Sequence, residues 1–232
     1  MKNGMIFEEA YVNMLKEEKE DRLTYLENLY NSKETITQQD VIDLFNIAYI
    51  DEWLAEYNYF ASWNLSQTEG KNDFDPEFKQ HESEERDHRY QIVERIKQLR
   101  GQAPTKLLQE FFTLNSNGEN WKQELMTSSF DILLNRYNEE LGAIEFYALF
   151  FKTLRRMSDD ERDTTSEMLV KKLKADEEEH AKDLRDLLIE NGILTNDLTN
   201  NMPATEEDDE EGEEGEEGEE DQDNVKGEDE DE

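Results

Sequence analysis

Two Glu-x-x-His segments carry the residue types and spacing best suited to metal chemistry. Glu85 is followed by His88 in HESEERDHRY, and Glu177 is followed by His180 in ADEEEHAKDL. Residues three apart lie on one face of a helix, so the carboxylate and the imidazole of each segment can reach one metal ion. The two glutamates directly after Glu177 are rotated by about 100° and 200° around the helix and point elsewhere.

A second repeat supplies one more glutamate to each half of the chain. The pattern Glu-x-x-Ala-x-x-x-Tyr begins at Glu52, in EWLAEYNYF, and again at Glu140, in ELGAIEFYA. The chain therefore contains two copies of a helix pair, in which a single Glu is followed by Glu-x-x-His. If each pair is an antiparallel hairpin with arms of equal length, the helical rise brings all these side chains to one level of a bundle.

The elements that position these residues are predicted to be helices, and no stretch alternates in the manner of a strand. Apolar residues recur at steps of three and four over four segments, which indicates four helices facing a common core. Thr37 is the expected N-cap of the first, and SQTEGKNDFDP is expected to end it. These helices are expected at 37 to about 63, 76–100, 121–156 and from the turn at 158–160 to 192, with a further helix at 6–31 and a long crossover at 101–120.

An ionisable residue interrupts each apolar stripe near its middle. Burying a carboxylate without a partner is costly even after the surroundings relax, and no lysine or arginine occupies the stripe positions. Two divalent cations would supply the missing charge, while an acidic bundle with solvated charges is the alternative. His81 is expected to be structural or to support the ligands. The predicted metal ligands, which are also the predicted catalytic residues, are Glu52, Glu85, His88, Glu140, Glu177 and His180; less well-placed carboxylates are Asp51, Glu56, Glu139 and Glu145.

Composition bounds the partners of the protein. The 232 residues carry a net charge of −36 and include no cysteine, which excludes disulfides and thiolate metal sites. A field of this sign argues against nucleic acid as a partner and favours cations. No apolar run approaches the roughly 20 residues that span a bilayer, and the first residues lack the apolar core of a signal peptide. A cytoplasmic location without a membrane partner is expected.

The C-terminal segment differs in composition from the rest. Residues 206–232 hold 19 acidic residues, one lysine and no aromatic residue, so we expect a disordered tail. The tail either keeps the protein soluble or gathers cations. The predicted organisation is a helical extension at 1–36, a four-helix bundle at 37–192, a linker at 193–205 and the acidic tail at 206–232.

These segments resemble the ferritin-like di-iron carboxylate proteins, and bacterioferritins and Dps-like ferritins in particular. HESEERDHRYQIVERIKQLRGQAP is similar to the second bundle helix of bacterioferritin, and ELGAIEFYALF and ADEEEHAKDL are similar to the third and fourth. The resemblance covers about residues 38–192. It implies an all-α, ferritin-like four-helix bundle with a long crossover between its second and third helices.

The same resemblance implies roles for individual residues. Glu85 and Glu177 would bridge two iron ions, one Glu and one His would complete each ion's ligands, and manganese is an alternative metal. Tyr59 matches a tyrosine that lies beside the metals in the family, although an ordinary core aromatic is the other reading. Arg86 stands where bacterioferritin has its haem-ligating methionine, so haem is not expected. The cysteine pair of many Dps-like ferritins is also missing, and an extension precedes the bundle.

The function that the resemblance implies is a ferroxidase that oxidises Fe(II) with dioxygen or peroxide. Such a protein would store or detoxify iron in a homo-oligomeric cage of 12 or 24 subunits. One alternative is a di-iron or manganese–iron oxidase, oxygenase or rubrerythrin-type peroxidase, for which a small oligomer and an apolar pocket beside the metals are expected. A non-catalytic assembly protein is the other alternative.

Overall fold

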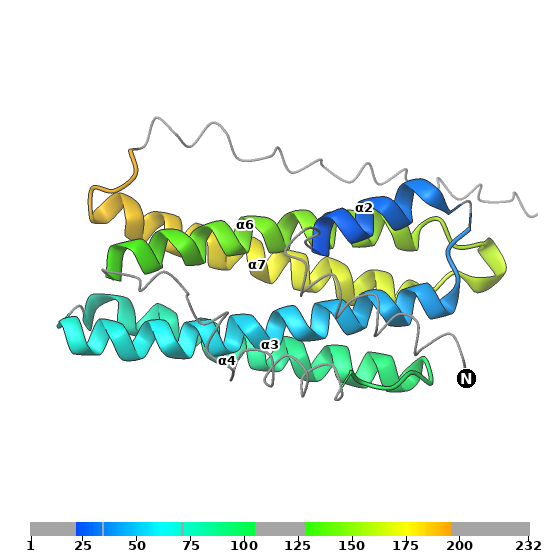
Figure 1. Ribbon diagram of the computed structural model, residues 1–232, viewed down its shortest axis with the longest axis horizontal. Coiled ribbons are helices and arrows are strands. Elements are labelled where there is room, and N and C mark those ends of the chain that lie inside the picture. The colour runs from blue at the N-terminus through cyan, green and yellow to red at the C-terminus, as the bar shows by residue number, and fades with distance from the viewer. Residues whose placement is uncertain (1–21, 34, 71, 105–128, 196–232) are drawn as a thin grey trace, which may run out of the picture. The chain divides into compact units, whose positions relative to one another are not determined.

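The computed structural model describes residues 22–33, 35–70, 72–104 and 129–195, and within these ranges every regular element is helical (Figure 1). The predicted all-α class is therefore confirmed. Residues 6–21, most of the crossover, positions 121–128 and the acidic tail lie outside the described residues. The elements are α2 (Arg22–Ser32), α3 (Gln38–Glu69), the 3-10 turn η1 (Asn72–Phe74), α4 (Asp75–Gln98), α6 (Ser129–Leu154), the 3-10 turn η2 (Asp159–Glu161) and α7 (Thr164–Glu190).

Four long helices form the bundle as two hairpins. Helix α3 pairs with α4, and α6 pairs with α7; α3 also contacts α6, and α4 contacts α7. Figure 1 shows the two hairpins packed against each other, with the shorter α2 lying along α6. Among the described helices, none has a stretch apolar and long enough to cross a bilayer.

Helix α3 begins where the sequence predicts and ends later. The Thr37 side chain accepts a hydrogen bond from the Asp40 backbone, and the Asp40 carboxylate accepts one from the Thr37 backbone at 2.9 Å, which completes a capping box. The predicted end near residue 63 is wrong. Ser66 and Thr68 remain in the helix, with their hydroxyls donating to carbonyls one turn back. The helix stops at Gly70, which has the left-handed φ of 70° that favours glycine.

Hydrogen bonds connect the C-terminal end of α4 to the N-terminal end of α7. Asp163 caps α7 by accepting a hydrogen bond from the Ser166 backbone at 3.1 Å. Arg95 of α4 donates to the same Asp163 carboxylate and to the Ser166 hydroxyl. Gly101, just after α4, is required by close packing, because a Cβ there would lie 2.7 Å from a methyl group of Ile42.

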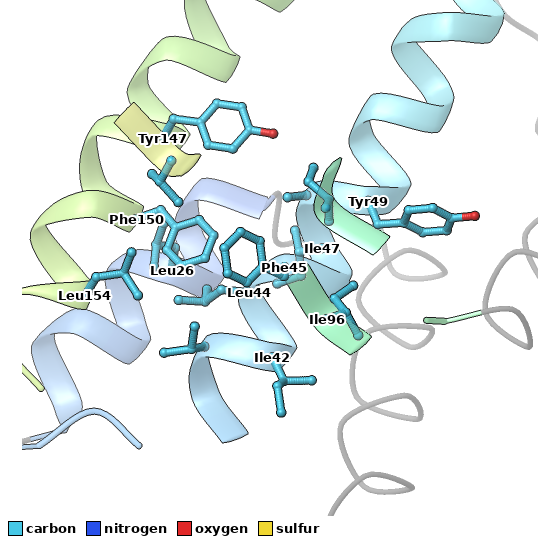
Figure 2. Packing of buried hydrophobic residues seen from close by; sticks show 14 of the residues in the cluster. Leu26, Ile42, Leu44, Phe45, Ile47, Tyr49, Ile96, Tyr147, Phe150 and Leu154 are labelled. Carbon is cyan, nitrogen blue, oxygen red and sulfur yellow. The ribbon is translucent and has the colours of Figure 1, made fainter. Parts of the chain in front are cut away.

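The core consists of two apolar clusters that flank the middle of the bundle. Members of the first include Leu26, Phe45, Ile96, Phe150 and Leu173, and Figure 2 shows several of them packed together. Members of the second include Tyr59, Phe78, Leu133, Leu184 and Leu188. Along each bundle helix, the predicted metal ligands lie between a residue of one cluster and a residue of the other. The acidic residues therefore form a layer inside an otherwise apolar core.

Candidate metal centre

The structure brings all six predicted ligands together in the acidic layer. Each of these residues is at most 3% exposed. They form two groups, and within each group one ligand atom from every residue lies within 4.8 Å of the others. Glu85 and Glu177 belong to both groups. The groups are Glu52, Glu85, His88 and Glu177, and Glu85, Glu140, Glu177 and His180.

Both imidazoles turn Nδ1 toward the carboxylates. The Nδ1 atom of His88 lies 3.2 Å from Glu52, 3.4 Å from Glu85 and 3.3 Å from Glu177. The Nδ1 atom of His180 lies 3.2 Å from both Glu85 and Glu177, and 3.9 Å from Glu140. The donor atoms thus point at two adjacent positions that share two carboxylates.

Several of the atoms that could bind a metal ion have no hydrogen-bond partner. Both carboxylate oxygens of Glu85, one oxygen of Glu177 and Nδ1 of His180 are buried without a hydrogen-bond partner. An unsatisfied buried polar atom is costly, and a native structure needs a reason to keep several together. Two divalent cations would satisfy them, and four carboxylates with two imidazoles form a donor set suited to Fe(II) or Mn(II). The residues present therefore fit a pair of such ions.

Burial and mutual repulsion shift the ionisation of the carboxylates. Burial, reinforced by the charges of Glu177 and Glu85, raises the pKa of Glu52 and of Glu140 well above the ordinary value. Burial also opposes ionisation of Glu177, but the nearby imidazoles of His180 and His88 outweigh it and lower the pKa of Glu177. Glu52 and Glu140 therefore tend to hold protons when no metal neutralises the layer.

The same contacts keep the histidines protonated. Burial disfavours the charged imidazole of His180, but its interactions with Glu177 and Glu85 outweigh burial and raise its pKa to about 12. The pKa of His88 is also raised, since Asp176, Glu177 and Glu52 outweigh its desolvation. A metal ion at Nδ1 must displace these protons.

Two acids that the sequence analysis did not select hold the outer nitrogens of the histidines. The Nε2 atom of His88 lies 3.0 Å from Asp176 of α7, and Nε2 of His180 lies 2.9 Å from Glu84 of α4. Such a carboxylate fixes the tautomer and orientation of a metal-binding histidine. The signal was present in the sequence, because each acid directly precedes the Glu of a Glu-x-x-His segment.

Two tyrosines bind the remaining carboxylates across the bundle. The Tyr59 hydroxyl of α3 donates to Glu140 of α6, and the Tyr147 hydroxyl of α6 donates to Glu52 of α3. Tyr59 was a candidate from the sequence, and the structure places it in contact with a predicted ligand. Tyr147 was missed, although it is the tyrosine of the second Glu-x-x-Ala-x-x-x-Tyr repeat.

His81 packs against a predicted ligand. It is fully buried, and its ring centroid lies 4.2 Å from that of His180 and 5.0 Å from that of Tyr59. Burial, followed by the proximity of His180, lowers the pKa of His81 to about 3, so its ring is neutral. The arrangement suits the supporting role expected from the sequence, although His81, Glu84 and His180 also lie close enough to share an ion.

The less well-placed carboxylates belong to neither group that contains the six predicted ligands. Three of them pair with arginines: Asp51 with Arg22 at 3.3 Å, Glu56 with Arg89 at 2.7 Å, and Glu139 with Arg136 at 2.8 Å. Glu145 is exposed.

Two cavities approach the acidic layer. The α3–α6 cavity, of about 200 Å³, reaches four predicted ligand carboxylates and is also lined by Arg22, Asp51 and Glu139. The α4–α7 cavity, of about 210 Å³, reaches only His88 and His180 among the predicted ligands. The residues of the α4–α7 cavity are Glu84, Asp87, His88, Gln91, Lys172, Asp176, Glu179 and His180.

Comparisons with known proteins identify the family of this fold. The sequence profile of the ferritin-like domain matches residues 42–190, whereas no curated protein matches the sequence. Among solved structures, the chain is similar to a dodecameric thioferritin of the bacterial domain, the bacterioferritin-related protein from Bacteroides fragilis. The identity is 27% and the TM-score 0.54, over 68% of this chain and 89% of that chain. The chain belongs to the ferritin-like family.

Proposed function

We propose that this protein is a ferroxidase that binds two Fe(II) ions at the six-residue cluster and oxidises them with dioxygen or peroxide. The observation that carries the proposal is the pair of ligand groups that share Glu85 and Glu177. Membership of the ferritin-like family supports an iron-related function.

Each residue of the cluster has a role in this proposal. Glu85 and Glu177 would contact both ions, with Glu52 and His88 completing the ligands of one and Glu140 and His180 those of the other. Each Fe(II) gives up one electron. Dioxygen takes both electrons and two protons and leaves as hydrogen peroxide; peroxide as the oxidant would instead take two electrons and two protons and leave as two waters. The protein fixes the ligand atoms in a buried layer.

The α3–α6 cavity favours a cationic substrate over an organic one. Six carboxylates line it, from Asp51, Glu139 and four predicted ligands, against one guanidinium. A cavity lined by one sign of charge concentrates ions of the opposite sign. Apolar side chains of Leu54, Ala55, Ala143 and Phe146 also line the cavity, but the concentration of acidic groups beside them supports Fe(II) as the substrate.

We infer that the chain assembles as a homo-oligomeric shell. The Bacteroides fragilis protein is dodecameric, and its alignment with this chain covers 89% of its length. Light scattering on the purified full chain is expected to give a particle of several hundred kilodaltons. A monomer or dimer would contradict the inferred shell and favour the oxidase alternative.

The ligand assignment is tested by titration with Co(II), whose visible absorption reports its coordination. The wild-type chain is expected to bind two ions, Glu52→Ala or Glu140→Ala one, and Glu177→Ala neither tightly, because Glu177 serves both positions. Glu178→Ala is the matched control, since Glu178 pairs with Lys174 at 2.8 Å on the same helix.

Ferroxidase activity is measured on the same variants as Fe(III) formation and oxygen consumption after Fe(II) is added. Activity is expected to be lost in Glu177→Ala and retained in Glu178→Ala. Two tightly bound ions and full activity in Glu177→Ala would overturn the proposal.

A further inference from the structure

The helix that precedes the bundle places a positive charge beside the α3–α6 cavity. Arg22 lines this cavity and pairs with Asp51 at 3.3 Å. Its guanidinium carbon lies 5.9 Å from the ring centroid of Phe146, another lining residue. Gly142 leaves room for it, because a Cβ at that position would lie 3.3 Å from an Nη atom of Arg22. Arg22 thus occupies a defined position among the acids of the cavity.

The rest of α2 is anchored away from the cavity. Leu26 is fully buried in the first apolar cluster, and Arg156 donates hydrogen bonds to the backbone carbonyls of Tyr30 and Lys33. The Arg22 side chain, in contrast, is 25% exposed. The anchored backbone of α2 thus carries an Arg22 side chain that is partly open to solvent.

The α3–α6 cavity is the more direct approach to the ligand carboxylates. It touches Glu52, Glu85, Glu140 and Glu177. The α4–α7 cavity meets the imidazoles instead, and their outer nitrogens are already engaged by Asp176 and Glu84. An ion that arrives through the α4–α7 cavity would have to pass the histidine rings before it reached a bridging carboxylate.

We propose that Arg22 controls the entry of divalent cations through the α3–α6 cavity, an inference that rests on the proposed function. While Arg22 is paired with Asp51, its charge repels an approaching cation and its side chain forms part of the cavity wall. When Arg22 swings away, its charge no longer opposes the cation, and the acids that line the cavity attract it.

The experiment is stopped-flow measurement of Co(II) binding to the full chain, followed by the visible absorption of the coordinated ion. Arg22→Ala is expected to accelerate binding by roughly tenfold, the lower end of the range over which local fields change association rates. Arg22→Gln, which keeps a hydrogen-bond donor for Asp51 but no charge, is expected to change the rate in the same direction.

Two further variants separate the effect of charge from a loosened helix. Asp51→Asn leaves the arginine charge uncompensated and is expected to slow Co(II) entry, whereas a loosened α2 would speed entry in both Arg22→Ala and Asp51→Asn. Lys172→Ala is the matched control: Lys172 lines the α4–α7 cavity and pairs with Asp176 at 2.9 Å. Its rate is expected to equal that of the wild type.

The outcomes distinguish the proposed gate, in which Arg22 controls cation entry, from the ferroxidase function on which it rests. If every variant binds two Co(II) ions but Arg22→Ala and Arg22→Gln do so at the wild-type rate, the gate is overturned and the ferroxidase site stands. Faster entry in Lys172→Ala alone would also overturn the gate, because it would place the route at the α4–α7 cavity. If the wild-type chain binds no Co(II), both proposals fail.

Discussion

Each histidine of the acidic layer is held from both sides, by the predicted ligand carboxylates at Nδ1 and by an acid from the opposite helix at Nε2. Asp176 and Glu84 therefore decide which nitrogen of His88 and His180 faces the metal position. An acid in this position also makes the ligand more basic, which strengthens metal binding. In the proposed di-metal site, these two residues would orient the two imidazoles as ligands.

Replacing either outer acid by its amide is expected to weaken one metal position. Asp176→Asn should lower Co(II) affinity at the His88 position, and Glu84→Gln at the His180 position, each by roughly ten- to a hundredfold. Competition titration against a chelator measures the two affinities. Glu179→Gln is the control, because Glu179 lines the same cavity. An equal loss in the control would assign the effect to the general charge of the cavity instead.

Metal binding is expected to release protons. The raised pKa of His180, at about 12, and the raised pKa of His88 mean that both imidazoles are protonated in the metal-free chain at neutral pH. Because protons and metal compete for Nδ1, affinity should rise as pH rises and fall as pH is lowered. Calorimetry in two buffers of different ionisation enthalpy counts the protons, with about two expected from the histidines and further protons from Glu52 and Glu140. Equal heats in both buffers would contradict this prediction.

At the scale of the elements, Asp163 fixes the register between α4 and α7. It caps α7 through the Ser166 backbone and accepts hydrogen bonds from Arg95 of α4. Asp163→Ala is expected to lower the free energy of unfolding by about 1 kcal/mol, as for other N-cap losses. Urea unfolding of the metal-free chain measures it. Asp159→Ala is the control, since Asp159 is exposed in η2.

The stabilisation from Asp163 should also depend on pH. Partial burial opposes its ionisation, but hydrogen bonds from Arg95 and Ser166 outweigh burial and lower its pKa. A lowered pKa stabilises the folded state above the ordinary aspartate value of about 3.9, and this contribution is lost as pH falls through the folded-state pKa. The difference between wild type and Asp163→Ala should therefore shrink at low pH. A difference that is the same at acidic and neutral pH would show that ionisation of Asp163 does not contribute.

The features that the sequence predicts are those encoded over one or two turns of helix. Thr37 and Asp40 form a capping box three residues apart, and the spacing of Glu177 and His180 fixes a shared face, so both could be read locally. The end of α3 was misplaced because polar residues alone do not stop a helix whose hydroxyls can bond to the preceding turn. Gly70 is the first residue there that stops it.

Contacts between helices were harder to predict. Tyr147 could have been found from its repeat, because Tyr59 was selected from the first copy. The pairing of Asp176 with His88, in contrast, depends on how α7 faces α4. The contact between Arg22 and Asp51 depends on where α2 packs, and no pattern within Arg22–Ser32 specifies that helix's partner.

At the scale of the whole bundle, the acidic layer is the weakest level of an otherwise apolar core. The clusters on either side hold the four helices together. The layer between them contributes buried carboxylates that repel one another and polar atoms that lack hydrogen-bond partners. Each hairpin supplies half of the predicted ligands: α3 and α4 give Glu52, Glu85 and His88, and α6 and α7 give Glu140, Glu177 and His180. Ions bound at both positions would join the two hairpins.

Metal binding is therefore expected to stabilise the bundle against heat. A ligand that binds only the folded chain adds about 2.7 kcal/mol at a free concentration one hundred times its dissociation constant. Calorimetric scans with Co(II) should show a higher melting temperature for the wild type. Mg(II) should have little effect, because it prefers oxygen ligands and keeps its waters.

Glu177→Ala separates this effect from binding to acids elsewhere in the chain, such as the 19 acidic residues of 206–232. The variant keeps those acids but loses a carboxylate common to both ligand groups. Its melting temperature should no longer respond to Co(II), because the ions that join the two hairpins are lost with Glu177. An undiminished rise in Glu177→Ala would mean that the stabilising ions bind outside the acidic layer, and the di-metal assignment would then be wrong.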